Sequence, residues 1–224
     1  MVRVWERVSS LGVADDVVVA TDSDEIAETL RRANASVALT SETHPSGTDR
    51  VAEVAELPRF AGFDVIINVQ GDEPFVAEPA VRGAAKFVTS GRFPLGTAAA
   101  PAAADALDHP NVVKVVTADD GRALYFSRAP IPWLRDATDA AERSRIARQH
   151  IGVYAYTRDA LATWVSLPPH PLERIERLEQ LRPLAAGLAM GVASVSELPI
   201  GGVDTEDDLA RANARWLALS ADRT

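Results

Sequence analysis

The sequence predicts an α/β fold with a mixed, mainly parallel β-sheet and a β-rich elaboration. In the N-terminal half, short β-branched runs alternate with segments of helical periodicity, which is typical of a doubly wound sheet. From Val112 the pattern changes, because two strand-like runs flank the turn Ala118–Gly121 and predict an antiparallel hairpin. The 224 residues, 47% of them hydrophobic, suffice for one core. We therefore expect a single domain over residues 1–224, with the elaboration around 112–156.

Each element is predicted from its local pattern. Asp22–Glu25 resembles a capping box that opens a helix, and Thr48 is expected to cap another. The apolar, β-branched run Val65–Val69 predicts a buried strand. Prolines and polar residues between 130 and 150 predict a surface excursion. In chain order we expect a helix end at 2–8, a strand at 16–20, a helix at 22–33, a strand at 37–40, a helix at 48–57, a strand at 65–69, a helix at 78–89, strands at 95–100, 112–117, 122–126 and 151–156, helices at 158–165 and 172–181, a strand at 192–195 and a helix at 205–217.

The composition excludes several classes of protein and site. The 32 acidic and 23 basic residues give a net charge of −9, a poor match to the phosphates of a nucleic acid. The absence of cysteine excludes disulfides, thiolate metal sites and cysteine nucleophiles. The sequence has neither a basic, apolar leader nor an apolar stretch of about 18 residues, so we expect a cytoplasmic protein without a membrane partner.

Two loop carboxylates are candidates for a metal site. Asp72 follows the Val65–Val69 strand, and ligands of open α/β sheets bind beyond the carboxyl ends of strands. Asp204 lies in a glycine-rich loop immediately before a helix. Two such carboxylates, with phosphate and water oxygens, suit Mg²⁺. A simple turn after the strand and a capped helix start are the structural alternatives.

Other polar residues could bind an anionic or polar ligand. Ser46, Gly47 and Thr48 lie at a helix start beside Arg50, where free N–H groups can bind an anion, although a capped helix explains them equally. His150 and Tyr154 are four positions apart in a predicted strand, so their rings share one face of the sheet.

Further candidates lie closer to the C-terminus. Proline and aromatic neighbours would hold Arg128 rigidly, as suits a cation that meets a carboxylate. Glu176, Glu179 and Gln180 share a predicted helix with arginines, so surface ion pairs are the alternative there.

In their order, these segments resemble the 3-deoxy-manno-octulosonate cytidylyltransferases, also called CMP-Kdo synthetases. The similar segments span nearly the whole chain: Val18–Asp22, Ser46–Arg50, Asn68–Pro74, Asn111–Val116, Ala123–Arg128, Ile131–Trp133, His150–Tyr154, Pro171–Arg182 and Gly202–Thr205. The resemblance implies a Rossmann-like nucleotidyltransferase fold. It also implies Mg²⁺-dependent transfer of CMP from CTP to 3-deoxy-D-manno-octulosonate (Kdo), with release of pyrophosphate, for lipopolysaccharide biosynthesis by a homodimer.

The resemblance also implies a role for each candidate residue. Asp72 and Asp204 are similar to the catalytic metal ligands. The residues that resemble nucleotide contacts are Ser46, Gly47, Thr48, Arg50 and Gln70. The residues that resemble sugar-acid contacts are Arg128, His150, Tyr154, Glu179 and Gln180.

The sequence departs from the family pattern at its start. Family members begin with a strand and a loop of the type Pro-Ala-Arg-x-x-Ser-x-Arg-Leu-Pro-x-Lys, which would bind the triphosphate. Met1 aligns beyond that loop, and neither Lys86 nor Lys114 is placed to replace its lysine. We therefore expect a fold without its first strand and a chain of weak or no activity. The alternatives are a non-catalytic protein that binds a sugar acid or nucleotide, and a cytidylyltransferase for another sugar acid such as sialic acid.

Overall fold

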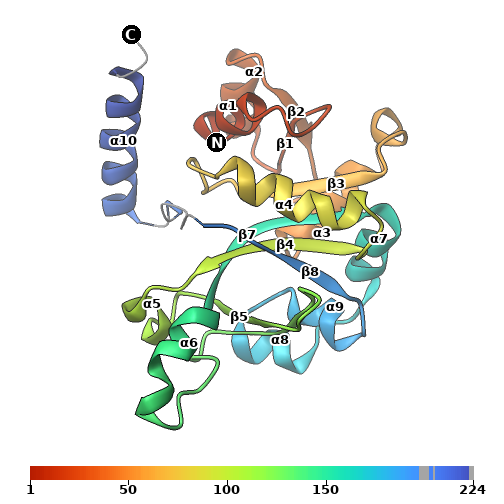
Figure 1. The fold of residues 1–224 in the computed structure, drawn as a ribbon. Helices are drawn as coiled ribbons and strands as arrows, with labels where there is room; N and C mark the ends of the chain where they lie inside the picture. Colours follow the sequence, from red (N-terminus) through yellow and green to blue (C-terminus); the bar gives the residue numbers. More distant parts are fainter. Residues whose placement is uncertain (197–201, 204, 222–224) are drawn as a thin grey trace.

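A six-stranded mixed sheet forms the centre of the molecule (Figure 1). The computed structural model describes residues 1–196, 202–203 and 205–221. The strands of this sheet are β3 (Val65–Val69), β4 (Leu95–Pro101), β5 (Lys114–Thr117), β6 (Ala123–Ser127), β7 (Arg148–Thr157) and β8 (Met190–Ser194). The expected mixed α/β architecture is therefore confirmed.

Strand β7 organises this sheet. It pairs antiparallel with β4 along one edge and with β3 and β5 along the other. Strands β3 and β4 consequently run in the same direction but are separated by β7, while β4 pairs in parallel with β8. The hairpin of β5 and β6 was predicted, with its turn at 118–121. The antiparallel insertion of β7 between two parallel strands was not.

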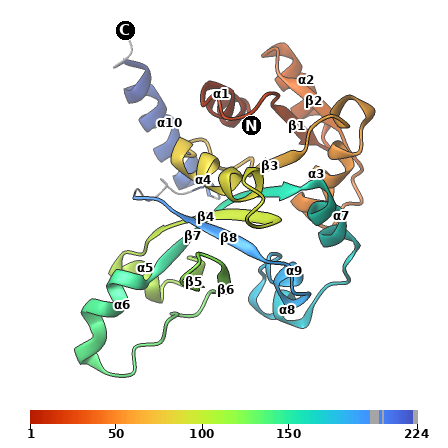
Figure 2. The same ribbon diagram turned by 45° about the vertical axis from the view of Figure 1, so that its right-hand side comes forward.

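Alternate residues of β7 support the cores on the two faces of the sheet. Val153 and Ala155 pack with the buried side chains of α4 (Glu78–Thr89). Tyr154 and Tyr156 pack on the other face, against residues of α7 (Arg158–Ser166). Figures 1 and 2 show α4 on one side of the sheet and α8 and α9 on the other. This period of two is what a strand buried on both faces requires.

A second, two-stranded parallel ladder lies beside the main sheet. It joins β1 (Val18–Thr21) to β2 (Ser36–Leu39). Within the described ranges, β1 pairs with no strand other than β2, and β3 with none other than β7. Both β1 and β3 line one large cavity. Strands of both sheets therefore border the same cavity, and no hydrogen-bonded ladder joins them among the described residues.

The helices lie close to their predicted positions, with informative exceptions. The remaining helices are α1 (Val2–Ser10), α2 (Asp24–Arg32), α3 (Gly47–Ala55), α5 (Ala104–Asp108), α6 (Ala140–Ile146), α8 (Pro171–Glu176), α9 (Leu181–Ala185) and α10 (Glu206–Ala221), with 3₁₀ turns at Pro58–Phe60 and Ala137–Asp139. Ser23 and Ser46, not Asp22 and Thr48, accept the capping hydrogen bonds of α2 and α3. Helix α5 and the helical turns within the 130–150 excursion were not predicted.

The helix predicted over 172–181 is wrong. Helix α8 ends at Glu176, because Arg177 adopts a left-handed conformation with φ 55° and ψ 46°. A turn through residues 178–180 then leads into α9. Glu179 and Gln180, which follow this break, line the cavity.

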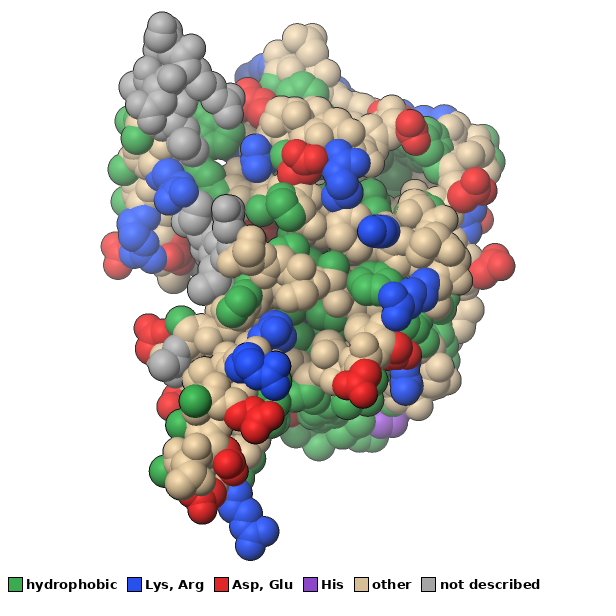
Figure 3. All heavy atoms as spheres, in the orientation of Figure 1, with side chains coloured by type: hydrophobic (Ala, Val, Ile, Leu, Met, Phe, Trp, Pro, Cys, Tyr) green, Lys and Arg blue, Asp and Glu red, His purple; other side chains and the backbone are tan. Residues whose placement is uncertain are grey.

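The surface adds two observations. Figure 3 shows acidic and basic side chains interspersed over one face rather than gathered by sign. Within the described part of the chain, each helix is too short or too polar to span a lipid bilayer.

Candidate active site

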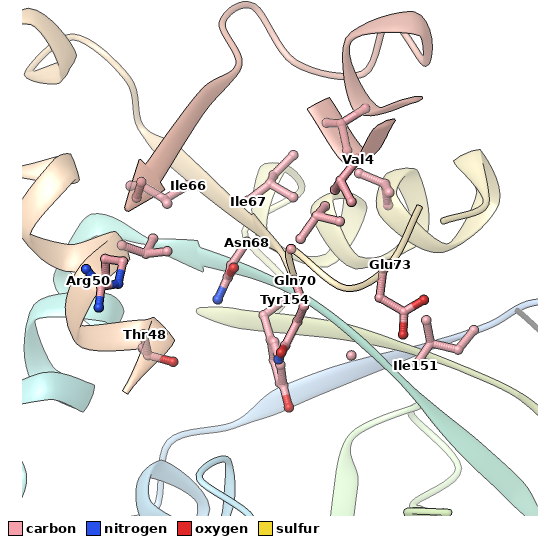
Figure 4. A pocket seen from close by; sticks show the side chains of 18 of the residues that line it. Val4, Thr48, Arg50, Ile66, Ile67, Asn68, Gln70, Glu73, Ile151 and Tyr154 are labelled. Carbon is pink, nitrogen blue, oxygen red and sulfur yellow. The ribbon is translucent and has the colours of Figure 1, made fainter. Parts of the chain in front are cut away.

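One cavity of about 1000 Å³ receives residues from both halves of the chain. Figure 4 shows Asn68 and Gln70 from the end of β3 beside Tyr154 of β7, with Thr48 and Arg50 of α3 across from them. Ten predicted site residues line this cavity: Gly47, Thr48, Arg50, Gln70, Asp72, Arg128, His150, Tyr154, Glu179 and Gln180. The fold therefore brings together segments that are up to 133 positions apart in sequence.

The start of α3 is joined to the α8–α9 turn by buried polar contacts. The Ser46 hydroxyl lies 2.9 Å from Glu179 Oε1 and also contacts Asp49 Oδ2. Thr48, which is 4% exposed, forms side-chain hydrogen bonds with Glu179 and Tyr156. Burial raises the pKa of Glu179, because desolvation penalises the carboxylate more than its hydrogen bonds favour it. A protonated Glu179 could donate a hydrogen bond within this cluster of oxygen atoms.

Arg50 is anchored at the carboxyl ends of β1 and β2. Its Nη2 lies 2.6 Å from Asp22 Oδ2, and its Nη1 donates to Thr40 Oγ1. The hydrogen bond from Arg50 lowers the pKa of Asp22, so the ion pair persists at neutral pH. The guanidinium is therefore oriented at the cavity wall before any ligand is present. Sequence reasoning missed Asp22 as its partner, although its position just after a strand was a usable signal.

The loop after β3 lies against the loop that precedes α10. The backbone N–H of Val203 donates to the carbonyl oxygen of Asp72 at 2.9 Å. A side chain at Gly202 would begin only 3.5 Å from Glu73 Oε1 and 3.6 Å from Asp72 Oδ2. The second predicted carboxylate, Asp204, lies outside the described residues. Gly202 and Val203 are the described residues of this segment that lie beside the Asp72 loop.

Arg128 is held in a cradle of carbonyl groups. Its Nε donates to Glu176 O at 2.9 Å, and its Nη1 and Nη2 lie 3.4 Å from the carbonyl oxygens of Pro110, Asn111 and Arg177. The Glu176 carboxylate accepts hydrogen bonds from the Ser127 hydroxyl at 2.6 Å and from the Arg128 N–H at 2.9 Å. Glu176 thus holds Arg128 in place through its carboxylate and its carbonyl group. The alternative of a surface ion pair is therefore wrong for Glu176.

His150 and Tyr154 share one face of β7, as predicted. Their ring centroids are 5.4 Å apart, and Trp164 packs edge-on against Tyr154 at 5.9 Å. His150 Nε2 lies 2.8 Å from Thr97 Oγ1, a partner that the sequence did not reveal. Burial lowers the pKa of His150 to about 3. The ring is therefore a neutral hydrogen-bonding group at physiological pH, not a cation.

Comparisons with known proteins show the family of the chain. A family model described as "Cytidylyltransferase" matches residues 1–191. The chain is 62% identical over 221 residues to the 3-deoxy-manno-octulosonate cytidylyltransferase of Gemmatimonas aurantiaca, covering 99% of this chain and 85% of that relative. It is 43% identical over 223 residues to the enzyme of the same name from Legionella pneumophila strain Corby, covering 98% and 88%.

A solved structure extends the likeness to three dimensions. A CMP:2-keto-3-deoxy-manno-octonic acid synthetase complexed with CTP superimposes with a TM-score of 0.86 at 33% identity, covering 99% of this chain and 87% of that one. The comparisons of sequence and of fold therefore identify the same family. The chain belongs to the 3-deoxy-manno-octulosonate cytidylyltransferase family.

Proposed function

We propose that this chain transfers CMP from CTP to Kdo, giving CMP-Kdo and pyrophosphate for lipopolysaccharide biosynthesis. The observation that carries the proposal is the single cavity in which α3 and the end of β3 face β7 and the α8–α9 turn. Relatives that carry the name of this activity match almost the whole chain. A solved relative with the same fold was crystallised with CTP.

The two substrates have separate ends of the cavity in this proposal. Ser46, Gly47, Thr48, Arg50 and Gln70 bind the nucleotide. The sugar acid is held by Arg128, His150, Tyr154, Glu179 and Gln180. The Ser46–Glu179 contact joins the two ends, so binding of one substrate orders residues that touch the other.

The reaction forms a bond between the anomeric oxygen of Kdo and the α-phosphorus of CTP. The bond from that phosphorus to the bridging oxygen breaks and pyrophosphate leaves with its electrons, while the proton of the anomeric hydroxyl is released to water. Because both reactants are anionic, positioning and charge neutralisation supply most of the rate enhancement. Arg128 compensates the sugar carboxylate, and neutral His150 orients the sugar without adding charge.

Asp72 and Asp204 are the residues that would hold a magnesium ion in this proposal. Asp72 and Asp204 offer the hard oxygen donors that Mg²⁺ prefers, and Gly202 and Val203, which precede Asp204 in the sequence, lie against the Asp72 loop. When bound, Mg²⁺ would neutralise phosphate charge and lower the pKa of the attacking hydroxyl. Asp72 and Asp204 are accordingly the proposed catalytic residues.

A pyrophosphate-release assay tests the function. We expect release only when CTP and Kdo are both present, with CMP-Kdo identified by mass spectrometry. Faster release with sialic acid than with Kdo would reassign the sugar. The assay is repeated with the chain extended at its N-terminus by the phosphate-binding loop that the family resemblance implies. No release from either form would favour a binding protein, whereas release from residues 1–224 alone would remove the expectation that the loop is required.

We also propose a cytoplasmic homodimer. The excursion at 130–150 exposes large apolar side chains, among them Trp133 at 76% and Ile146 at 45%. Exposed apolar groups of this size favour burial in an interface. Light scattering should give twice the mass of 24.0 kDa, and Trp133→Asp should shift the protein toward the monomer.

A further inference from the structure

Lys114 is a fully buried cation beside the sugar-acid end of the cavity. Its exposed fraction is 0%, and it begins β5, one of the inner strands of the sheet. Among the described residues, no carboxylate lies within 4.0 Å of its ammonium group, so Lys114 forms no ion pair with them. Burying an unpaired charge is costly, so a lysine at this position needs compensation from strong hydrogen bonds.

Three backbone carbonyl groups supply that compensation. The Nζ of Lys114 donates to Val112 O at 2.7 Å, to His109 O at 3.1 Å and to Arg128 O. An ammonium group has three N–H donors, and all three are satisfied here. Lys114 therefore ties the 109–112 loop and the backbone of Arg128 to one point.

The same loop forms part of the cradle around the Arg128 guanidinium. The carbonyl oxygens of Pro110 and Asn111 accept from Arg128 Nη1, and both residues lie between two acceptors of Lys114. Lys114 thus fixes Arg128 twice, through its own carbonyl group and through the loop that orients its side chain. Desolvation lowers the pKa of Lys114, and the nearby Arg128 charge acts in the same direction.

We infer that Lys114 is a positioning residue that presents Arg128 to the carboxylate of the sugar acid. The inference rests on the proposed function, in which Arg128 meets that carboxylate. Lys114 itself does not line the cavity, so it acts through Arg128. Its removal should therefore weaken binding of the sugar acid while leaving CTP binding unchanged.

The chain offers a matched control, because Lys86 is its only other lysine, lies on α4 and does not line the cavity. We expect Lys114→Met to raise the KM for Kdo about tenfold, with the KM for CTP unchanged. Lys86→Met should leave both constants at wild-type values. A KM for Kdo unchanged in Lys114→Met, or raised equally by Lys86→Met, would overturn the inference.

A double-mutant cycle separates positioning from a general loss of structure. If Lys114 acts through Arg128, Lys114→Met should have no further effect on the KM for Kdo in an Arg128→Ala background. Additive effects would contradict the inference. Thermal unfolding is measured in parallel, and a Lys114→Met protein that no longer unfolds cooperatively would assign Lys114 to overall stability and overturn the positioning role.

Chemical rescue provides an independent check, since the sequence contains no cysteine. Lys114→Cys, alkylated with 2-bromoethylamine in denaturant and refolded, regains an ammonium group of nearly the original length. We expect the KM for Kdo to return toward the wild-type value, whereas iodoacetamide treatment should not restore it. If neither wild type nor Lys86→Met releases pyrophosphate, this result would count against the proposed function. Calorimetric titration of Kdo would then compare the affinities of Lys114→Met and wild type directly.

Discussion

The Ser46 hydroxyl lies 2.9 Å from the Glu179 carboxylate, although the two residues are 133 positions apart in the chain. Ser46 caps the helix that we propose binds the nucleotide, and Glu179 belongs to the turn that we propose binds the sugar acid. This contact makes the protonation state of Glu179 a property of both halves of the site.

The pH dependence of the free energy of unfolding should reveal the protonation of Glu179. Burial raises the pKa of Glu179 above its usual 4.5, so the folded state binds this proton more tightly than the unfolded state. The free energy of unfolding should consequently fall as pH rises from 4.5 through the raised pKa. Glu179→Gln has no such proton, and its stability relative to wild type should increase over the same range. Urea unfolding at a series of pH values measures this, and parallel curves for the two proteins would refute it.

His150 should remain neutral throughout the pH range of activity. Its pKa is lowered to about 3 by burial, far below the usual 6.5. We expect its ring protons to show no titration above about pH 5 in an NMR experiment. His150→Asn should lower kcat/KM for Kdo by about tenfold at each pH from about 6 to 9, because a hydrogen-bonding ring rather than a charge is lost. An NMR inflection near 6.5 would contradict this assignment.

The metal site predicts a difference between the two acids that flank β3. Asp72 follows the carboxyl end of this strand, and Asp64 precedes its amino end. Asp72→Asn should reduce kcat by about 100-fold or more, since it removes a proposed metal ligand, whereas Asp64→Asn should leave kcat nearly unchanged. EDTA should abolish activity and Mg²⁺ should restore it. Equal activity of Asp72→Asn and Asp64→Asn would rule out the proposed metal site.

Replacement of Arg177 should have a smaller, salt-dependent effect on the KM for Kdo. Its exposed side chain lines the cavity and makes no ion pair within 4.0 Å in the described part of the chain. Arg177→Ala should raise the KM for Kdo about threefold at low ionic strength, and the difference should shrink with added salt. Arg174→Ala removes an exposed arginine of the same segment that does not line the cavity, so it is the matched control. An identical response of the two variants would indicate a general effect of charge.

Local patterns predicted the elements whose signals are local. The bounds of β3 and α4 agree with the sequence predictions residue by residue, because an apolar run and a proline at the first turn are strong signals. The Ser46–Thr48 segment contains three residues that can cap a helix, and its pattern alone did not choose among them.

Other features depend on contacts that the local sequence does not encode. A non-glycine residue in the left-handed region, Arg177, ends α8 without any of the usual stop signals. The antiparallel insertion of β7, the Thr97 partner of His150 and the carbonyl cradle of Arg128 all join distant segments. The family resemblance predicted which residues line the cavity. The hydrogen bonds among these residues could be identified only from the three-dimensional structure.

The break between the two ladders has a consequence for how the protein opens. Strands β1 and β2 share a small apolar cluster of their own, built on Ala38, Val54 and Phe60. Because no described backbone hydrogen bond joins this unit to β3, its amides can exchange with solvent while the six-stranded sheet stays intact. Arg50 is tied to the unit through Asp22, so local unfolding there would remove the anchor of a residue proposed to bind the nucleotide.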